Sequence, residues 1–340
     1  MSQLWGLVRS IVFGASNPTH NGNSFDPARD IASLAGKVVL ITGAAGDLGR
    51  QTAIELTRYG RPARIYVADL PRDEQAKTNI VERIKREART GEAMLEQIDS
   101  TEIRFLDLDL ASFDSIRRCA SDFLAMEERL DLLILNAGTF RTRPGTTMEG
   151  YELHFGINYL GHALLCQLCL PLMTQIAQKQ PSSDFRIVAV SSEGHMAAPP
   201  GGIQFDKLKS DCANMTVLQR YGQSKIALIG FTRELASRYP LIKVAAVHPG
   251  RINTGVTATF IKESLLFRLI ALAPFFFVER SLGVRNHLWA ATSPDVVSGK
   301  YYVPVGVPDK ENKMARDTDL SKRLWQWTND ELTTTHLPSK

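Results

Sequence analysis

Short apolar runs recur along the chain and alternate with longer segments in which apolar and polar residues mix at helical spacing. The runs are rich in Val, Ile and Leu, and they end at Gly, Pro or small polar residues. Runs of this kind are typical of buried strands in a parallel sheet. They cover residues 38–41, 64–68, 104–110, 130–135, 186–190, 242–247 and 301–303. Strands that alternate with helices at these distances predict a Rossmann-type doubly wound α/β fold, with helices on both faces of the sheet.

The alternating pattern begins near residue 36 and ends near residue 305, so we expect a single domain over residues 36–305. Residues 1–35 form an N-terminal extension, whose segment 17–30 is rich in Asn, Pro, Gly and Ser and is typical of a loop. Residues 306–340 are expected to form a C-terminal tail.

The first apolar run leads directly into a glycine-containing turn, and a helical pattern follows the turn. Free N–H groups and the dipole at the start of a helix attract a pyrophosphate, and glycines let the backbone approach it. The turn therefore predicts a dinucleotide-binding site. Its residues are Thr42, Gly43, Gly46, Asp47, Leu48 and Gly49.

An acidic residue, Asp69, ends the second apolar run about twenty residues after the glycine turn. At that spacing a carboxylate can bind the ribose hydroxyls of NAD, and it would repel the 2′-phosphate of NADP. Asp69 therefore favours NAD. NADP stays an alternative, because Arg50 and Arg72 could serve a 2′-phosphate.

Tyr221 and Lys225 lie in a segment, 218–239, that the pattern predicts to be helical. Residues four apart share a helix face, so the ammonium group of Lys225 should lie near the phenol of Tyr221. A phenol has an ordinary pKa of about 10, and a nearby cation lowers this pKa toward the range in which a general base can act.

Two further polar features accompany this pair. Ser191 and Ser192 end the fifth apolar run, and a hydroxyl at the carboxyl end of a strand can hold a substrate oxygen. Asn158 interrupts the long apolar helix expected over residues 150–178. It could kink the helix or hold a water molecule that relays protons to Lys225.

In their order along the chain, these residues resemble the classical short-chain dehydrogenase/reductase family over roughly residues 36–305, and the local sequence resembles its retinol-dehydrogenase-like branch. The motifs that carry the resemblance are Thr42-Gly43…Gly49, Asp69, Asp109, Asn136-Ala137-Gly138, Asn158-Tyr159-Leu160-Gly161-His162, Val190-Ser191-Ser192, Tyr221-Gly222-Gln223-Ser224-Lys225 and Val247-His248-Pro249-Gly250…Thr254. One position departs from the family, because Asp47 stands in place of the middle glycine of the turn. Asp tolerates positive φ, but its charge should weaken pyrophosphate binding unless a cation such as Arg50 offsets it.

The resemblance implies roles for the matching residues in an NAD(P)-dependent interconversion of an alcohol and its ketone or aldehyde. Tyr221 is then the general acid/base, and Lys225 lowers its pKa and binds the nicotinamide ribose. Ser192 orients the substrate oxygen, and Asn158 completes a proton relay.

The resemblance also places the cofactor against a second group of residues: Asp109, Leu110, Asn136, Ala137, Gly138, Pro249, Gly250 and Thr254. Within this group Asp109 touches the adenine, Asn136 lines the cleft and Thr254 binds the carboxamide. The apolar segment at about 255–280 lies where this family carries its substrate lid, which suggests an apolar substrate. The same segment could instead contact a membrane surface or a second copy. The resemblance implies a homodimer that forms through the helices at 150–178 and 218–239.

Charge and composition narrow the remaining classes of function. The net charge is +4 with both signs spread along the chain, so we expect no nucleic-acid partner. Four cysteines suit a reducing compartment, and we expect the C-x-x-C pair Cys166 and Cys169 to pack in the core, with no metal bound. No run reaches the ~18 apolar residues of a membrane span. We therefore expect a cytoplasmic protein that could associate with a membrane.

Two other classes remain open. A serine hydrolase would need a G-x-S-x-G motif, and Ser192-Glu193-Gly194 supplies half of it, with Val190 in place of the first glycine. A non-catalytic nucleotide-binding or scaffold member of the same fold is the second alternative, which only Asp47 favours.

Overall fold

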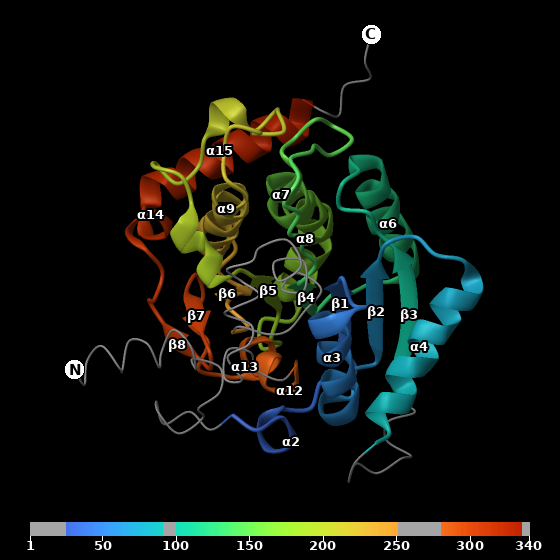
Figure 1. The fold of residues 1–340 in the computed structure, drawn as a ribbon. Helices are drawn as coiled ribbons and strands as arrows, with labels where there is room; N and C mark the ends of the chain where they lie inside the picture. Colours follow the sequence, from blue (N-terminus) through green and yellow to red (C-terminus); the bar gives the residue numbers. More distant parts are fainter. Residues whose placement is uncertain (1–24, 91–99, 251–279, 335–340) are drawn as a thin grey trace, which may run out of the picture.

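The computed structural model describes residues 25–90, 100–250 and 280–334 (Figure 1). Their centre is one eight-stranded sheet in the order β3-β2-β1-β4-β5-β6-β7-β8. Neighbouring strands are parallel, except that β8 pairs antiparallel with β7. The strands are β1 (Val38–Thr42), β2 (Arg64–Asp69), β3 (Glu102–Asp107), β4 (Leu132–Leu135), β5 (Arg186–Val190), β6 (Lys243–Val247), β7 (Tyr301–Val303) and β8 (Val307–Pro308). The predicted doubly wound fold is confirmed.

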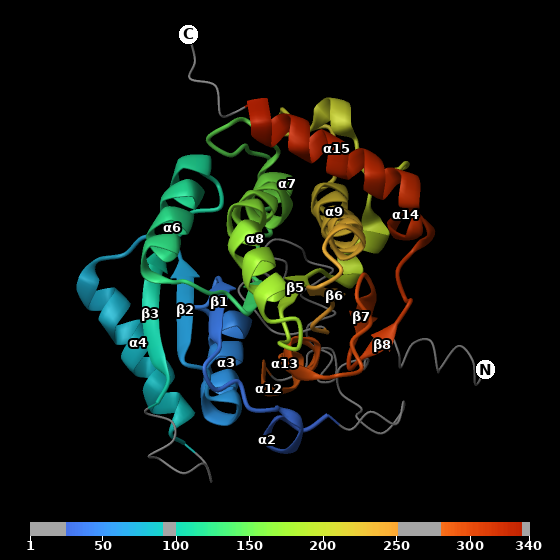
Figure 2. The ribbon, with the colours of Figure 1, turned by 180° about the vertical axis from the view of Figure 1, so that it is seen from behind.

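The apolar runs are buried on both sides because the sheet separates two hydrophobic cores. In β1, Val38 and Leu40 enter one core, while Val39 and Ile41 enter the other. The long helices of the first face are α6 (Phe113–Met126), α8 (Gly161–Lys179), α9 (Val217–Arg238) and α15 (Thr318–Thr334), seen from behind in Figure 2. Those of the second face are α3 (Asp47–Glu55), α4 (Glu74–Ala88) and α13 (Arg285–Thr292). The short helical segments are α2 (Pro27–Asp30), η1 (Leu56–Gly60), α7 (Leu153–Phe155), η2 (Gly156–Leu160), η3 (Glu193–Ala197), η4 (Phe205–Lys207), α12 (Arg280–Gly283) and α14 (Lys313–Arg316).

The order of the strands reverses between β1 and β4. From β1 the chain proceeds to β2 and β3 on one side, and β4 then begins on the other side of β1. In an open α/β sheet, ligands bind outside the carboxyl ends of the strands at such a switch point. A ligand site is therefore expected at the carboxyl ends of β1 and β4.

Two predicted elements differ from the observed ones. The third strand ends at Asp107 rather than at residue 110, and Leu108 to Leu110 leave the sheet toward the switch-point edge. The helix predicted over 150–178 consists of α7, the π-helical segment η2 and α8. Asn158 lies within η2, so the chain stays helical there but widens by a π-turn, a feature that is frequent at functional sites.

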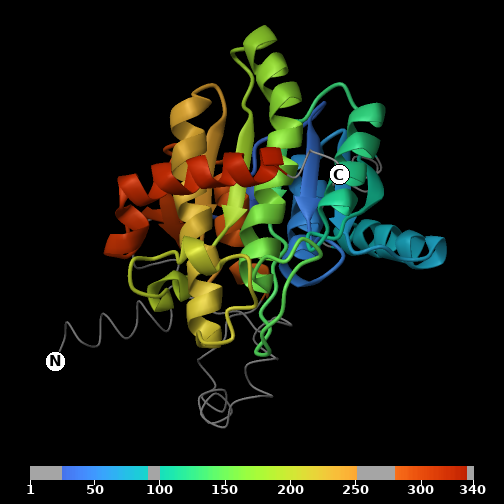
Figure 3. The ribbon, with the colours of Figure 1, turned by 90° about the horizontal axis from the view of Figure 1, so that it is seen from above.

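The segment predicted as a C-terminal tail carries β8, α14 and α15, and α15 lies across α9 and α8 (Figure 3). Phe231 and Trp325 stack with ring centroids 5.7 Å apart, and the Tyr159 and Thr328 hydroxyls are 2.6 Å apart. The boundary at residue 305 therefore does not coincide with an edge of the core. A dimer formed by direct pairing of α8 and α9, as the resemblance implies, would require α15 to move.

The extension contributes to the second core through Phe25, Ile31 and Leu34, which are buried against α3 and its neighbours. Thr254 and most of the apolar segment at 255–280 lie outside the described residues. The stretch Leu153–Lys179 is long and apolar enough to cross a membrane, contrary to the expectation that no run would qualify. More than half of it is buried inside the protein, as in the core helix of a soluble protein.

Candidate active site

A cavity of about 1070 Å³ opens at the switch point, along the carboxyl edge of the sheet. Most of the predicted site residues line this one cavity. They are Gly43, Gly46, Asp47, Leu48, Asp69, Asp109, Leu110, Asn136, Ala137, Gly138, Ser192, Tyr221, Lys225, Pro249 and Gly250. Thr42, Gly49 and Asn158 are not among the lining residues.

The glycine turn is shaped by close packing at two positions and by open space at a third. Gly43 has a φ of +68°, and a Cβ there would lie 2.8 Å from the Cα of Ala137. A Cβ on Gly49 would lie 2.5 Å from the carbonyl oxygen of Gly43. A Cβ on Gly46 would meet no atom within 4 Å, so this position leaves room for a ligand above the start of α3. The turn therefore fits a bound phosphate group.

Asp47 has a positive φ of 33°, which Asp tolerates better than most residues. It is the first residue of α3, where an acidic side chain is favourable to the helix dipole itself. The side chain of Arg50 forms an ion pair with Glu87 on α4, with Nη1 3.1 Å from Oε1. Its charge is therefore shared between this ion pair and any cofactor phosphate. The departure from the family's glycine thus leaves the shape of the turn intact.

Thr42 holds the framework of the cavity from beneath. Its hydroxyl oxygen accepts hydrogen bonds from the backbone N–H groups of Asn136 (3.0 Å) and Ala137 (2.9 Å). The amide of Asn136 in turn donates to the carbonyl oxygen of Thr42 at 2.8 Å. These bonds tie the end of β1 to the end of β4, so Thr42 positions the cavity wall rather than lining it.

Sequence reasoning missed the role of His162, which links Thr42 to Asn158. Because the Thr42 oxygen already accepts two N–H groups, its own proton is available to His162 Nε2, 2.9 Å away. His162 Nδ1 then donates to the carbonyl oxygen of Asn158 at 2.9 Å. Burial lowers the pKa of His162 to about 4, which keeps the ring neutral. The signal in the sequence was a histidine one helical turn after Asn158 in an apolar helix.

Asp69 faces the glycine turn from the end of β2. Its carboxylate accepts hydrogen bonds from the backbone N–H groups of Ala45 (3.0 Å) and Leu70 (2.9 Å). Arg72, which also lines the cavity, lies 3.4 Å from the same carboxylate. A carboxylate and a guanidinium therefore lie side by side where a nucleotide ribose would bind.

Tyr221 and Lys225 project from α9 into the opposite end of the cavity. Burial raises the pKa of Tyr221 to about 12, with Ser192 acting in the opposite direction and the charge of Glu193 adding a smaller rise. The ammonium group of Lys225 lies 5.4 Å from the centroid of the Tyr221 ring and donates to the carbonyl oxygen of Val190 at 2.9 Å. Burial lowers the pKa of Lys225 to about 7.

The expectation that Lys225 lowers the pKa of Tyr221 stays a prediction. In this structure the desolvation of the phenol is the largest effect on its pKa.

The two serines at the end of β5 have different environments. The hydroxyl of Ser191 is buried and donates to the carbonyl oxygen of Lys225 at 3.0 Å. Both serines border the cavity, but the Ser192 side chain donates to no backbone carbonyl of the described residues, and its oxygen accepts the backbone N–H of Gly194 at 3.1 Å. Of the two serines, Ser192 is therefore the one that can reach a substrate.

The contacts of Ser192 do not match a serine hydrolase. His195 directs its Nδ1 to the carbonyl oxygen of Ser192, at 2.7 Å, and its Nε2 accepts the backbone N–H of Asn312 at 3.1 Å. Both ring nitrogens are thus engaged away from the Ser192 hydroxyl. Within the described part of the chain, no histidine is hydrogen-bonded to that hydroxyl as a general base would be.

The side chain of Asn158 joins two elements beside the cavity. Its Oδ1 accepts the backbone N–H of Thr139 at 2.7 Å, and its Nδ2 donates to the Ser224 hydroxyl at 3.0 Å. A Cβ added to Gly138 would lie 3.4 Å from Asn158 Oδ1 and 3.8 Å from Lys225 Nζ, so both groups border the same small space. A proton relay from Asn158 to Lys225 stays a prediction.

Several known proteins are similar to this chain in sequence or in fold. Residues 37–205 match the short chain dehydrogenase family. Human retinol dehydrogenase 14 is 36% identical over 308 residues, which cover 87% of this chain and 86% of that protein. An uncharacterized oxidoreductase of Schizosaccharomyces pombe, C736.13, is 34% identical over 311 residues and covers 88% of this chain and 86% of its own. A crystal structure of a putative uncharacterized protein from Mycobacterium paratuberculosis has a TM-score of 0.64 at 28% identity, over 89% of this chain and 96% of that one.

The chain therefore belongs to the short-chain dehydrogenase/reductase family of oxidoreductases. Within the family it is similar to the retinol dehydrogenases, among which mouse retinol dehydrogenase 12 is 35% identical over 86% of this chain.

Proposed function

We propose that the protein is an NAD(P)-dependent oxidoreductase that interconverts an apolar primary or secondary alcohol and its aldehyde or ketone. The observation that carries the proposal is the layout of one cavity. The glycine turn and Asp69 stand at one end, and Ser192, Tyr221 and Lys225 stand at the other. A dinucleotide that lies between them would bring its nicotinamide to the hydroxyl and ammonium groups of Ser192, Tyr221 and Lys225.

The cofactor would be held by the chain's own turn and strand ends. Gly46 leaves space above the N-terminus of α3 for the pyrophosphate, and Asp69 offers its carboxylate to the adenosine ribose. Asp109 and Asn136 line the wall between these points. When bound, the cofactor supplies the hydride chemistry.

The protein residues would hold the substrate and move its proton. The Ser192 hydroxyl orients the substrate oxygen beside the Tyr221 hydroxyl. In the oxidising direction the Tyr221 oxygen takes the proton of the alcohol, and in the reducing direction it returns a proton to the carbonyl oxygen. Lys225 and Asn158 would pass that proton on through the space beside Gly138.

An apolar substrate is favoured by the other lining residues at the Tyr221 end. Leu153, Ile157 and Leu218 face the cavity there. Such a surface stabilises a substrate mainly by burying apolar area. We propose NAD as the preferred cofactor because Asp69 faces the turn, although Arg72 gives NADP a cation to approach.

The test is a panel of long-chain alcohols, aldehydes and ketones assayed with each cofactor at the nicotinamide absorbance. We expect turnover with at least one apolar pair and a lower KM for NAD(H) than for NADP(H). Binding of neither NADH nor NADPH at millimolar concentration would contradict the proposal and would favour the scaffold alternative. Modification of Ser192 by a labelled fluorophosphonate would favour a hydrolase.

A further inference from the structure

A fully buried acid, Glu152, lies at the start of the helix that leads to Asn158. Its carboxylate accepts hydrogen bonds from the backbone N–H groups of His154 (3.1 Å) and Phe155 (2.8 Å) and so caps α7. It also lies 3.0 Å from His154 Nδ1 and 3.7 Å from the Nε of Arg220. The proposed catalytic steps do not use this acid, yet a buried carboxylate is retained at the cost of its desolvation.

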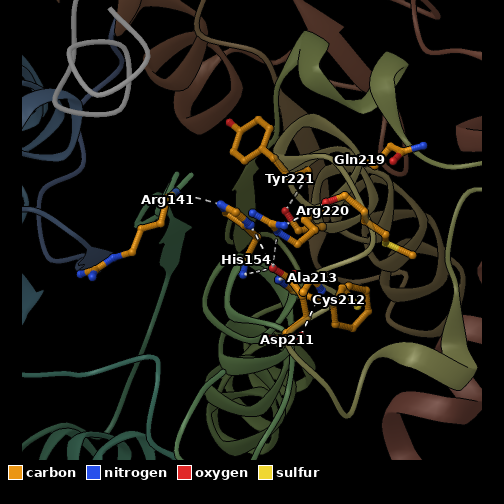
Figure 4. A network of polar contacts seen from close by, with 12 residues as sticks. Arg141, His154, Asp211, Cys212, Ala213, Gln219, Arg220 and Tyr221 are labelled. Carbon is orange, nitrogen blue, oxygen red and sulfur yellow. Dashed lines mark hydrogen bonds and ion pairs between the residues drawn. The ribbon is translucent and has the colours of Figure 1, made fainter. Parts of the chain in front are cut away.

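His154 connects Glu152 to the loop that follows β4. Figure 4 shows its ring beside the backbone of Arg141. The backbone N–H of Arg141 donates to His154 Nε2 at 2.9 Å. Because Nε2 is an acceptor, the ring proton must reside on Nδ1, where it is donated to Glu152. The imidazole is thus held as one neutral tautomer between an acid and a backbone amide. In Figure 4 the guanidinium of Arg141 points away from His154, so only the backbone of that residue is held.

Arg220 connects the same acid to the start of α9. Its side chain is 2% exposed. Nη1 donates to the carbonyl oxygen of Met215 at 3.0 Å, and Nη2 donates to the carbonyl oxygen of Thr142 at 2.6 Å. The guanidinium therefore fixes the first turn of the catalytic helix to the same loop that His154 holds.

These three anchored segments enclose the reacting groups. The helix capped by Glu152 continues into η2 and Asn158, and Arg220 immediately precedes Tyr221. The ring of Tyr221 lies edge-on to His154 with centroids 6.0 Å apart, and edge-on to Phe140 at 5.2 Å. In Figure 4 the hydroxyl of Tyr221 points away from His154, which leaves the network behind the ring and the reacting oxygen in front of it.

We propose that Glu152, His154 and Arg220 are positioning residues that fix the ring of Tyr221 and hold loop 139–142 as the substrate-side wall of the cavity. The inference rests on the proposed function, because it assigns these residues to the reaction of Tyr221. It places them behind the alcohol and carbonyl subsite, and it leaves the dinucleotide end untouched. Their loss should therefore slow the chemical step without weakening cofactor binding.

A pair of His154 variants separates the two hydrogen bonds of the ring. In His154→Gln the side-chain amide oxygen can stand near the place of Nε2 and accept the Arg141 N–H. In His154→Asn the shorter amide can donate to Glu152 but cannot reach Arg141. The two variants thus differ mainly in whether the loop stays attached.

We expect His154→Asn to lower kcat on the order of 10- to 100-fold, because a small misplacement of reacting groups has effects of this size. Its affinity for NADH should match that of the wild type, and hydrogen exchange at the Arg141 amide should become faster. His154→Gln should restore exchange protection and most of kcat. The acid limb of the pH profile of kcat should shift only in the Asn variant, since only there is Tyr221 displaced.

Equal kcat in both variants and the wild type would overturn the inference, as would a parallel loss of NADH affinity. If His154→Asn does not fold, Arg220→Lys replaces it, because a lysine keeps the charge beside Glu152 but cannot reach both carbonyl oxygens. The same pattern of lower kcat and unchanged NADH affinity is expected of that variant. If the wild type turns over no substrate, the proposed function fails, whereas equal exchange at Arg141 in the two His154 variants shows the network itself to be wrong.

Discussion

The two ends of the cavity are built in different ways. At the dinucleotide end, the shape comes mainly from backbone groups, such as the turn around Gly46 and the N–H of Ala45 that binds Asp69. At the catalytic end, side chains are buried and bonded to partners far along the chain. Asn158 reaches Ser224, and Arg220 reaches Thr142.

The two ends should therefore differ in how substitutions affect ligand affinity and folding stability. The dinucleotide end presents its polar groups to solvent or ligand, so changes there should affect affinity and leave the fold intact. The catalytic end keeps Lys225 in a buried place, where the charged form is penalised. Substitutions that remove such a buried charge should lower activity and raise stability.

Replacing Lys225 by Met is expected to have the largest effect. It tests how much stability the protein loses by burying a lysine at the catalytic end. The folded-state pKa of Lys225 is lowered to about 7, whereas an unfolded lysine has a pKa of about 10.4. Between these values the unfolded state binds more protons, so the contribution of Lys225 to stability rises with pH. Lys225→Met should abolish turnover and raise the free energy of unfolding at pH 7 by on the order of a few kcal/mol.

Chemical denaturation of wild type and Lys225→Met at pH 7 and pH 10 measures this effect. The advantage of the variant should shrink toward pH 10. A variant that is less stable than the wild type at pH 7 would show that the bond to Val190 outweighs the burial penalty. The catalytic end would then not reduce stability as proposed.

Asp69→Ala should have an intermediate effect that is confined to the dinucleotide end. Removal of the carboxylate removes its bonds to the ribose and its repulsion of a 2′-phosphate, so the preference for NAD over NADP should fall roughly tenfold. The matched control is Arg72→Ala, which should change the preference in the opposite direction. Steady-state kinetics with both cofactors give the ratio of kcat/KM values, and an unchanged ratio in Asp69→Ala would remove Asp69 from this role.

Asp47→Gly should have the smallest effect. It removes a negative charge beside the expected pyrophosphate and relieves a residue at positive φ, so NADH should bind about two- to fivefold more tightly. Asp47→Asn is the control, because it removes the charge and keeps a residue that tolerates positive φ. Titration of NADH fluorescence measures all three proteins. Weaker binding in both variants would show that Asp47 contributes to the site.

The local features of the fold could be predicted from the sequence. The glycine turn is a continuous stretch, and the spacing of Tyr221 and Lys225 follows from the geometry of a single helix. The central strands β1 and β4 could be predicted because they are buried at every residue and are therefore almost entirely apolar. Where β3 leaves the sheet could not be predicted, because the apolar residues continue past Asp107 into the edge of the cavity.

The supports of the catalytic end could not be predicted, because each needs a partner from another part of the chain. Nothing near His162 in the sequence indicates that its ring meets Thr42, and nothing near Arg50 indicates Glu87. The seating of α15 on α9 likewise depends on pairs such as Phe231 and Trp325 that only the fold brings together.

The most direct test of the central claim is the rate of hydride transfer in Tyr221→Phe, measured in a single turnover with a substrate that the wild type accepts. Loss of the general acid/base should slow the step by on the order of 10²- to 10⁴-fold. The dissociation constant for NADH should stay unchanged, because the dinucleotide end does not depend on the phenol. A rate of hydride transfer close to that of the wild type would contradict the account.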